Sequence, residues 1–187
     1  MDGQLLDRRI GQRIRGRREE LGLSLEDLSE RCGVSRSMIS KIERVESSPT
    51  AALLGKLCSG LGITLSGLMA DAERAPHAVI RRNAQITWRD PETGYVRRMI
   101  SPPQTGSSLE IVEIELPPHA RVDFNAWKFQ AYEQQVIVLD GTLSLTIAHE
   151  CIDLKPGDCA HMSVESGNAF ENRTKKTVRY LVAIKKP

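Results

Sequence analysis

The chain has 187 residues, of which 40% are hydrophobic and 27% charged, and its formal net charge at pH 7 is +2. This size and composition are typical of a soluble globular protein and favour two small domains over a single large one. No apolar stretch is long enough to cross a bilayer, and the N-terminus lacks the apolar core of a signal peptide. We therefore predict a cytoplasmic protein with no membrane partner.

The cysteine pattern argues against a zinc site. None of the four has CxxC spacing, so we expect buried thiols without a metal: Cys32, Cys58, Cys151 and Cys159. A redox pair between Cys151 and Cys159, on neighbouring predicted strands, is the less favoured alternative.

The first predicted helix is basic, with Leu5, Ile10, Ile14 and Leu21 as its sparse apolar positions. A basic run is usually a solvated face, but next to a DNA-binding motif we expect some of its arginines to contact phosphates. These arginines are Arg8, Arg9, Arg13, Arg15, Arg17 and Arg18. Because the whole chain carries only +2, this basicity is local, and the second half has little attraction for nucleic acid.

Two short helices joined by a glycine turn are predicted over residues 24–44. Ser24 is suited to cap the first helix, with Asp27 completing a capping box, and Gly33 suits the left-handed conformation at its end. Ser35 then caps the second helix. The apolar residues are spaced to bury against one another: Leu25, Leu28, Val34, Ile39 and Ile42.

This pattern leaves Arg36, Ser37, Ser40 and Lys41 on the outward side of the second helix, where a major groove could receive them. Periodicity and caps alone therefore predict a helix-turn-helix whose second helix reads DNA.

Residues 5–70 also resemble the five-helix DNA-binding domain of the xenobiotic-response-element (XRE) family, which includes the phage repressors. The matching runs are LGLSLEDL at 21–28, GVS at 33–35, ISKIER at 39–44, PT at 49–50 and LGI at 61–63. The resemblance implies that Arg36, Ser37 and Lys41 read bases. It also places four residues near phosphates: Ser24, Ser35, Ser40 and Arg44.

The same resemblance implies an ion pair between Arg18 and Glu43, which is structural and so is not counted as a site. The family often has glycine after the recognition helix, whereas this chain has Val45. We therefore expect the following loop to differ slightly in shape.

The helical pattern ends after Met69, and Pro76 disfavours helix at the residue before it. We predict a DNA-binding domain at 1–70, a linker at 71–78 and a β domain at 79–187. Short runs with alternating or β-branched residues predict strands at 79–82, 95–100, 108–116, 134–139, 142–148, 151–154, 159–162 and 178–185. The expected fold class is thus α+β, with an all-α domain followed by a small β-sandwich or barrel.

The β domain resembles the cupin family, a small barrel or jelly roll, in EQQVIVLDGTLSL at 133–145, LKPGD at 154–158 and FEN at 170–172. A metal-binding cupin carries three histidines and a glutamate at four positions that are here Lys128, Gln130, Gln134 and Asn168. Lysine and neutral amides are poor metal ligands. We predict no metal, no cofactor and no enzymatic activity. Glu133 is one residue out of register and would face the other way.

Lys128 and Gln130 stand two apart on a predicted strand and therefore share a face, which the cupin register turns into the barrel. With Gln134 and Asn168 they suit a small anionic or zwitterionic metabolite, although a closed hydrogen-bond network filling the former metal site is the alternative. Trp127 would line the pocket mouth, or else belong to the core or a dimer contact. His119 and His161 are expected to be structural.

These features predict a sequence-specific transcription regulator that binds a palindromic DNA operator as a homodimer and senses a small-molecule effector in its barrel. Two alternatives remain open. One is a cupin enzyme with a DNA-binding appendage, and the other is a constitutive repressor whose barrel only dimerises.

Overall fold

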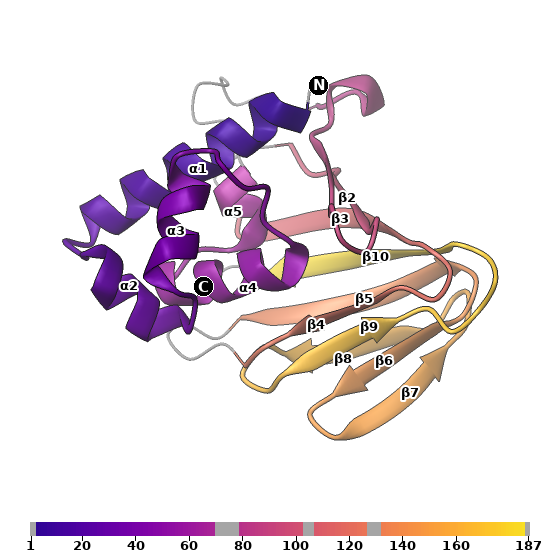
Figure 1. Cartoon of the computed structure of the whole chain (residues 1–187). Coiled ribbons are helices and arrows are strands. Elements are labelled where there is room, and N and C mark those ends of the chain that lie inside the picture. The colour runs from indigo at the N-terminus through magenta and orange to yellow at the C-terminus, as the bar shows by residue number, and fades with distance from the viewer. Residues whose placement is uncertain (1–2, 70–78, 103–106, 127–131, 186–187) are drawn as a thin grey trace. The chain divides into compact units, whose positions relative to one another are not determined.

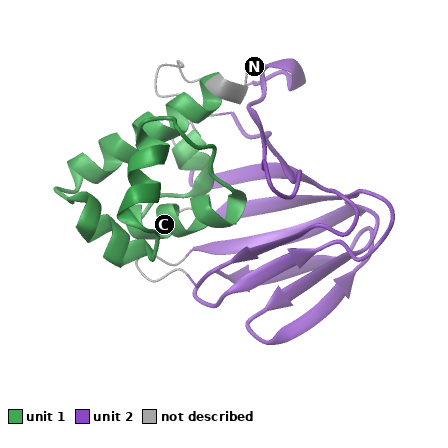
Figure 2. Ribbon diagram, in the orientation of Figure 1, with its two compact units in different colours: residues 1–70 green, residues 71–187 purple. Residues whose placement is uncertain are grey.

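The structure is a computed structural model that describes residues 3–69, 79–102, 107–126 and 132–185. The predicted linker at 71–78 lies outside the described residues, as do Trp127, Lys128 and Gln130. The chain divides into two compact units, residues 1–70 and 71–187 (Figures 1 and 2). The first unit is helical and the second consists of β-strands, which confirms the predicted fold class.

The described part of the first unit contains five helices. They are α1 (Gly3–Glu20), α2 (Leu25–Cys32), α3 (Arg36–Glu43), α4 (Ala51–Leu61) and α5 (Leu65–Met69). Leu6, Ile10 and Ile14 of α1 recur every fourth residue and are almost fully buried, so they lie on one face against the other helices. The other two apolar positions of this segment, Leu5 and Leu21, are 44% and 38% exposed.

The caps predicted for α2 and α3 are present. Ser24 accepts a hydrogen bond from the Asp27 backbone and donates its own N–H to the Asp27 carboxylate, which completes the capping box. Gly33 has φ 66°, and Ser35 Oγ accepts from the N–H of Met38. These local hydrogen bonds set where the two helices begin and end.

The end of α3 has the hydrogen bonds of a Schellman motif. The Val45 N–H donates to the Ile42 carbonyl (3.0 Å) and the Glu46 N–H donates to the Lys41 carbonyl (2.8 Å). Val45 has φ 61°, the left-handed conformation that glycine adopts at this position at little cost. The helix therefore ends as it would with glycine, at the expense of strain in a β-branched residue.

The described strands of the second unit form two antiparallel sheets. The six-stranded sheet has, in spatial order, β1 (Thr87–Arg89), β2 (Val96–Met99), β3 (Leu109–Leu116), β10 (Val178–Lys185), β5 (Glu133–Asp140) and β8 (Cys159–Ser163). The four-stranded sheet has β4 (Arg121–Phe124), β9 (Asn168–Glu171), β6 (Leu143–Ile147) and β7 (Glu150–Leu154).

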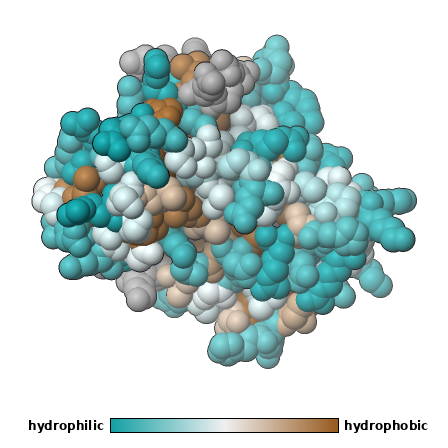
Figure 3. Space-filling model, in the orientation of Figure 1, coloured by the Kyte–Doolittle hydropathy of each residue, from teal (hydrophilic) through white to brown (hydrophobic). Residues whose placement is uncertain are grey.

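The two sheets pack on each other through aromatic side chains. Phe170 of β9 stacks on Tyr180 of β10, with ring centroids 5.5 Å apart and planes 4° apart. Phe124 of β4 meets Phe170 edge-on at 6.0 Å. The two sheets thus enclose the core of the predicted small barrel, and hydrophilic side chains cover much of the face shown in Figure 3.

Some strand predictions were wrong. Residues 79–81 form no strand, and a 3-10 helix, η1 (Arg82–Ala84), follows them. The short strands β1, β4 and β9 were not predicted. Cys151 and Cys159 are exposed rather than buried, and they lie on β7 and β8 in different sheets.

Candidate DNA-binding surface and barrel interior

The outward side of α3 carries the residues predicted to read bases. Arg36, Ser37 and Lys41 are exposed, and Ser40 is half-buried. Ile39 and Ile42 on the opposite side are buried in the core. Spacings of one, four and five residues put the four polar side chains on one helical face, which the core leaves available to a partner.

Three of the four residues predicted to lie near phosphates are at helix ends, whereas Ser40 lies within α3. Ser24 and Ser35 are the exposed N-caps of α2 and α3, and Arg44 is the exposed C-cap of α3. Backbone N–H groups at the start of a helix attract anions. Ser35 and Arg44 thus lie at the two ends of the predicted reading helix, and Ser24 lies at the start of the helix that precedes it.

Two carboxylates that the sequence reasoning missed pair with these arginines. Arg36 Nη1 lies 3.4 Å from Glu26 Oε2, and Arg44 Nε lies 3.0 Å from Glu46 Oε1. All four side chains are at least half exposed, so each pair contributes little to stability and DNA can displace it at low cost. The Glu26 contact joins α2 to α3 and had no signal in the local sequence.

The ion pair that the family resemblance implied holds α3 against α1. Arg18 donates to both oxygens of Glu43, at 2.7 and 2.9 Å, and its Nη1 donates to the Leu23 carbonyl at 2.9 Å. The Arg18 and Glu43 side chains are 12% and 7% exposed. The hydrogen bond to Glu43 raises the pKa of Arg18. This bidentate pair ties α1 to α3.

The arginines of α1 divide into two groups. Near the C-terminal end, Arg15 pairs with Glu19 at 2.8 Å and Arg17 pairs with Glu20 at 3.0 Å. Arg8 and Arg13 are exposed and form no ion pair within the described part of the chain. If α1 contacts phosphates, these two arginines are therefore the better placed.

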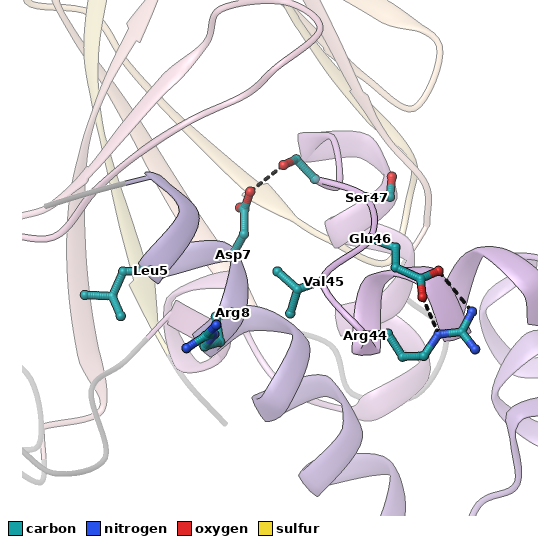
Figure 4. Close-up of a pocket in the computed structure, with 8 residues that line it drawn as sticks. Leu5, Asp7, Arg8, Arg44, Val45, Glu46 and Ser47 are labelled. Carbon is teal, nitrogen blue, oxygen red and sulfur yellow. Dashed lines mark hydrogen bonds and ion pairs between the residues drawn. The ribbon is translucent and has the colours of Figure 1, made fainter.

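A hollow of about 620 Å³ lies between the start of α1 and the loop after α3 (Figure 4). Leu5, Asp7 and Arg8 line one side, and residues 44–48 line the other. The Ser48 hydroxyl hydrogen-bonds to the Asp7 carboxylate and ties the loop to α1. Arg8 and Arg44 both line the hollow, although the sequence separates them by 36 positions.

In the barrel, the two described ligand candidates lie on inner faces of opposite sheets. Gln134 is half-buried and alternates with buried Val136 and Val138 on β5, whereas Asn168 is 6% exposed and shares its side of β9 with Phe170. Lys128 and Gln130 lie outside the described residues. Glu133 is exposed on the other face of β5, with its carboxylate 3.8 Å from Lys185 Nζ, as the register argument expected.

Asn168 also borders a hollow of about 550 Å³ that the sequence reasoning did not predict. Its other lining residues include Phe124, Asn125, His149 and Ser166. Its size is within the range of small-molecule sites. It could not be predicted from local sequence, because its lining residues come from three separate stretches of the chain that meet only in the folded protein.

The histidines considered as ligands are exposed. His119 is in a tight turn with φ 59°, closed by the Ala120 N–H donating to the Pro117 carbonyl, and His161 is on β8. Within the described ranges, no group of three or more His, Cys, Asp or Glu side chains is placed to hold a metal ion. No helix in this part of the chain is long and apolar enough to cross a membrane.

The burial of Arg97 was not predicted. Arg97 of β2 is 6% exposed and is paired in register with Trp88 of β1 and Ile114 of β3, both buried. Directly opposed residues on paired strands share a face, so Arg97 faces the barrel interior. Its burial was not predictable from the sequence, because Arg97 and Arg98 are identical neighbours and only one of them points inward.

Arg98 faces the opposite way and belongs to a network around Glu113 of β3. The buried Glu113 carboxylate lies 2.6 Å from Arg179, 3.6 Å from Arg82 and 3.7 Å from Arg98. The hydrogen bond from Arg179 holds the pKa of Glu113 below its usual range. The network joins η1, β2, β3 and β10.

Comparison with known proteins identifies a helix-turn-helix in the first unit. A family model described as helix-turn-helix matches residues 14–68. The HTH-type transcriptional regulator SutR of Escherichia coli (strain K12) is 27% identical over 175 residues, which are 94% of this chain and 93% of SutR. An HTH-type transcriptional regulator of Methanothermobacter thermautotrophicus is 43% identical over 49 residues, 26% of this chain and 71% of that protein.

The same organisation occurs in a solved structure. The crystal structure of an HTH_3 family transcriptional regulator from Vibrio cholerae superposes with a TM-score of 0.82. The superposition covers 100% of this chain and 99% of that one, at 22% sequence identity. At this identity the match shows a shared fold across both units.

Proposed function

Because the chain belongs to the helix-turn-helix (XRE) family of transcriptional regulators, we propose that it binds a palindromic operator as a homodimer and that its cupin-like barrel senses a small anionic or zwitterionic metabolite. The DNA-binding part of this proposal is supported by the two faces of α3. One face of this helix is buried and tied to α1 by Arg18 and Glu43, while its other face presents Arg36, Ser37 and Lys41.

In this proposal the contacts fall into two classes. Arg36, Ser37 and Lys41 contact base edges, because arginine and lysine donate to guanine and a serine hydroxyl serves either base pair. Ser24, Ser35, Ser40 and Arg44 contact phosphates and set the register of α3 on the duplex. One such helix reads only a short half-site, so a homodimer presenting two copies is the working unit.

The proposed effector site is the barrel interior. Gln134 and Asn168, on inner faces of the two sheets, support it, and Lys128 and Gln130 complete the proposed set. This set has a cation and amides but lacks the imidazole and carboxylate donors of a metal site, so binding is proposed to be metal-independent. A ligand alters operator affinity only if it binds the DNA-competent and DNA-incompetent arrangements of the dimer with different affinity. We propose that these arrangements differ in the orientation of the two N-terminal domains, which changes through the linker at 71–78.

The experiment that tests the DNA-binding half is selection of operators from a random duplex library with the full chain, followed by affinity measurements. Arg36→Ala should cost about 1–3 kcal/mol on the selected operator and relax the preference at one base pair. Arg15→Ala is the matched control, because it removes the same charge from α1 at a site already paired with Glu19. Failure to enrich any sequence would refute sequence-specific regulation.

Thermal unfolding and turnover measurements distinguish the proposed metabolite sensor from the two alternatives, a barrel that only dimerises and an enzyme. A metabolite sensor gains stability with the logarithm of ligand concentration, whereas a barrel that only dimerises shows no shift with any metabolite. Conversion of a metabolite by the purified protein would instead show that the barrel is a cupin enzyme with a DNA-binding appendage.

A further inference from the structure

The outer surfaces of the two sheets differ in composition. Side chains alternate along a strand, so the residues that do not face the barrel core lie on the outside of their sheet. On the four-stranded sheet these outward residues are mostly polar or charged. They are Arg121, Asp123, Ser144, Thr146, Cys151, Asp153, Ala169 and Glu171. This outer face has the composition of a surface in contact with water.

The middle of the six-stranded sheet differs. β10 and β5 lie side by side there (Figure 1), and they contain the unbroken apolar runs LVAI at 181–184 and VIVL at 136–139. An antiparallel strand with one face in water alternates apolar with polar residues, whereas an unbroken apolar run is typical of a strand covered on both faces. Leu181 and Ile137 are half-buried on the outer face, and Leu139, beside the β-bulge, is 41% exposed. The outer face of β10 and β5 thus has the composition of a surface that a partner covers.

Opposite charges lie at both ends of this face. Arg179 of β10 is paired in register with Asp140 of β5 at one end, and at the other end Lys185 is paired with Glu133. Lys185 Nζ lies 3.8 Å from Glu133 Oε2. The hydrogen bond to Glu113 and the charges of nearby carboxylates, Asp140 among them, raise the pKa of Arg179. Each end therefore has its cation on β10 and its anion on β5.

A second copy of the same face matches this pattern in one arrangement. With a two-fold axis parallel to the strands and midway between β10 and β5, β10 of one copy lies over β5 of the other. Arg179 then faces the partner's Asp140. At the other end, Lys185 faces the partner's Glu133. Both contacts also occur in reverse, as an interface with two-fold symmetry requires. An axis across the strands would instead place Arg179 over the partner's Lys185, so that like charges would meet.

We propose that the outer face of β10 and β5 is the homodimer interface, where the six-stranded sheets of two copies stack back to back about an axis parallel to the strands. This inference rests on the proposed function, because a homodimer is the unit that binds a palindromic operator, and it names the surface that forms the dimer. Stacked sheets lie about 10 Å apart, a gap that side chains from both faces fill. The barrel interior is on the other side of the sheet and remains available to an effector.

The charge pattern allows a test by complementary substitutions at one end of the face. Glu133→Lys makes this end wholly positive, and Lys185→Glu makes it wholly negative. Each variant alone repels its own copy, but the two together restore opposite charges across the interface. The Glu133 and Lys185 side chains are 58% and 71% exposed, so both variants should fold.

The measurement is sedimentation velocity of the full-length protein over a concentration series. The unsubstituted protein should form dimers, and each charge variant should dimerise more weakly by about tenfold or more, because like charges meet at the interface. An equimolar mixture of the two variants should recover most of the lost dimer. Leu181→Asp, at the centre of the face, should give monomers, whereas the matched control Thr146→Asp, on the outer face of the other sheet, should still form dimers.

Two results would overturn this interface while leaving a homodimer in place. One is equal dimerisation by all four variants, and the other is a mixture of the charge variants that associates no better than either alone. If Leu181→Asp does not fold, as judged by circular dichroism, the charge variants decide. A monomeric unsubstituted protein, the result expected if the chain's own first unit covers this face, would overturn both the interface and the homodimer. It would leave DNA binding itself to the independent operator selection.

Discussion

We predict that a glycine-to-alanine substitution has opposite effects on stability at two positions of α1, Gly11 and Gly16. A Cβ added at Gly11 would lie 2.5 Å from the Ile42 carbonyl oxygen, whereas one added at Gly16 would meet no atom within 4 Å. The Ile42 oxygen belongs to the α3 backbone and accepts a hydrogen bond from the Val45 N–H, so it has little freedom to move. Gly11→Ala therefore pushes α3 away from α1, and Gly16→Ala changes only helix propensity.

The magnitudes follow from two opposing terms. Replacing glycine by alanine inside a helix gains about 1 kcal/mol, which Gly16→Ala should show in full. At Gly11 that gain is set against overpacking, which typically costs about 1–3 kcal/mol, and the rigid backbone places the cost at the upper end. We expect Gly11→Ala to destabilise the first unit by about 1–2 kcal/mol.

The assay exploits the distribution of aromatic residues. Residues 1–70 contain no Phe, Tyr or Trp, whereas Trp88 and Trp127 both belong to the second unit. Far-UV circular dichroism at the helix minimum thus follows the first unit in a urea titration, and tryptophan fluorescence follows the second. Both substitutions should leave the fluorescence transition unchanged. Equal stabilisation by the two alanines would refute the close approach of α1 and α3.

Two further predictions concern charges. Glu113 has a lowered pKa in the folded protein, so its stabilising effect is complete above its unfolded pKa of about 4.3 and is lost as the pH falls through the lower folded value. The fluorescence-monitored urea midpoint should therefore drop less steeply below that pH in Glu113→Gln than in the exposed control Glu165→Gln, and identical slopes would contradict the network. Arg44→Ala should weaken binding to all DNA sequences and reduce the salt slope by about 1, whereas Glu46→Gln, which releases Arg44, should strengthen it. Lost preference at unchanged affinity in Arg44→Ala would contradict a phosphate contact.

The helix-turn-helix was predictable because its determinants are local. Ser24, Asp27 and Gly33 make their capping contacts within a few residues, and the buried positions repeat with the helical period. The resemblance then supplied the Arg18 and Glu43 pair, which is separated by 25 positions and has no local signal. Val45 shows the limit of a residue-type argument, because the hydrogen bonds ending α3 impose the left-handed conformation despite the side chain.

The β unit was harder to predict because its partners are distant. β4 and β9 have four residues each and pair with one another across more than 40 positions, so neither carries a long alternating pattern of its own. Arg97 was missed for a related reason. Only the pairing of β2 with β1 and β3 decides which of two adjacent arginines turns inward, and that register is a tertiary property.

The charges around α3 also bear on how such a protein would discriminate between DNA sequences. Glu26 and Glu46 each hold an arginine that the proposal assigns to DNA, so DNA must displace a carboxylate before it gains either contact. At Arg44, the proposed phosphate contact, this competition weakens the sequence-independent attraction that phosphates provide. Good contacts to base edges then account for a larger share of the total binding energy, and a wrong base costs relatively more. The carboxylate of Glu46 would thus favour specificity over affinity.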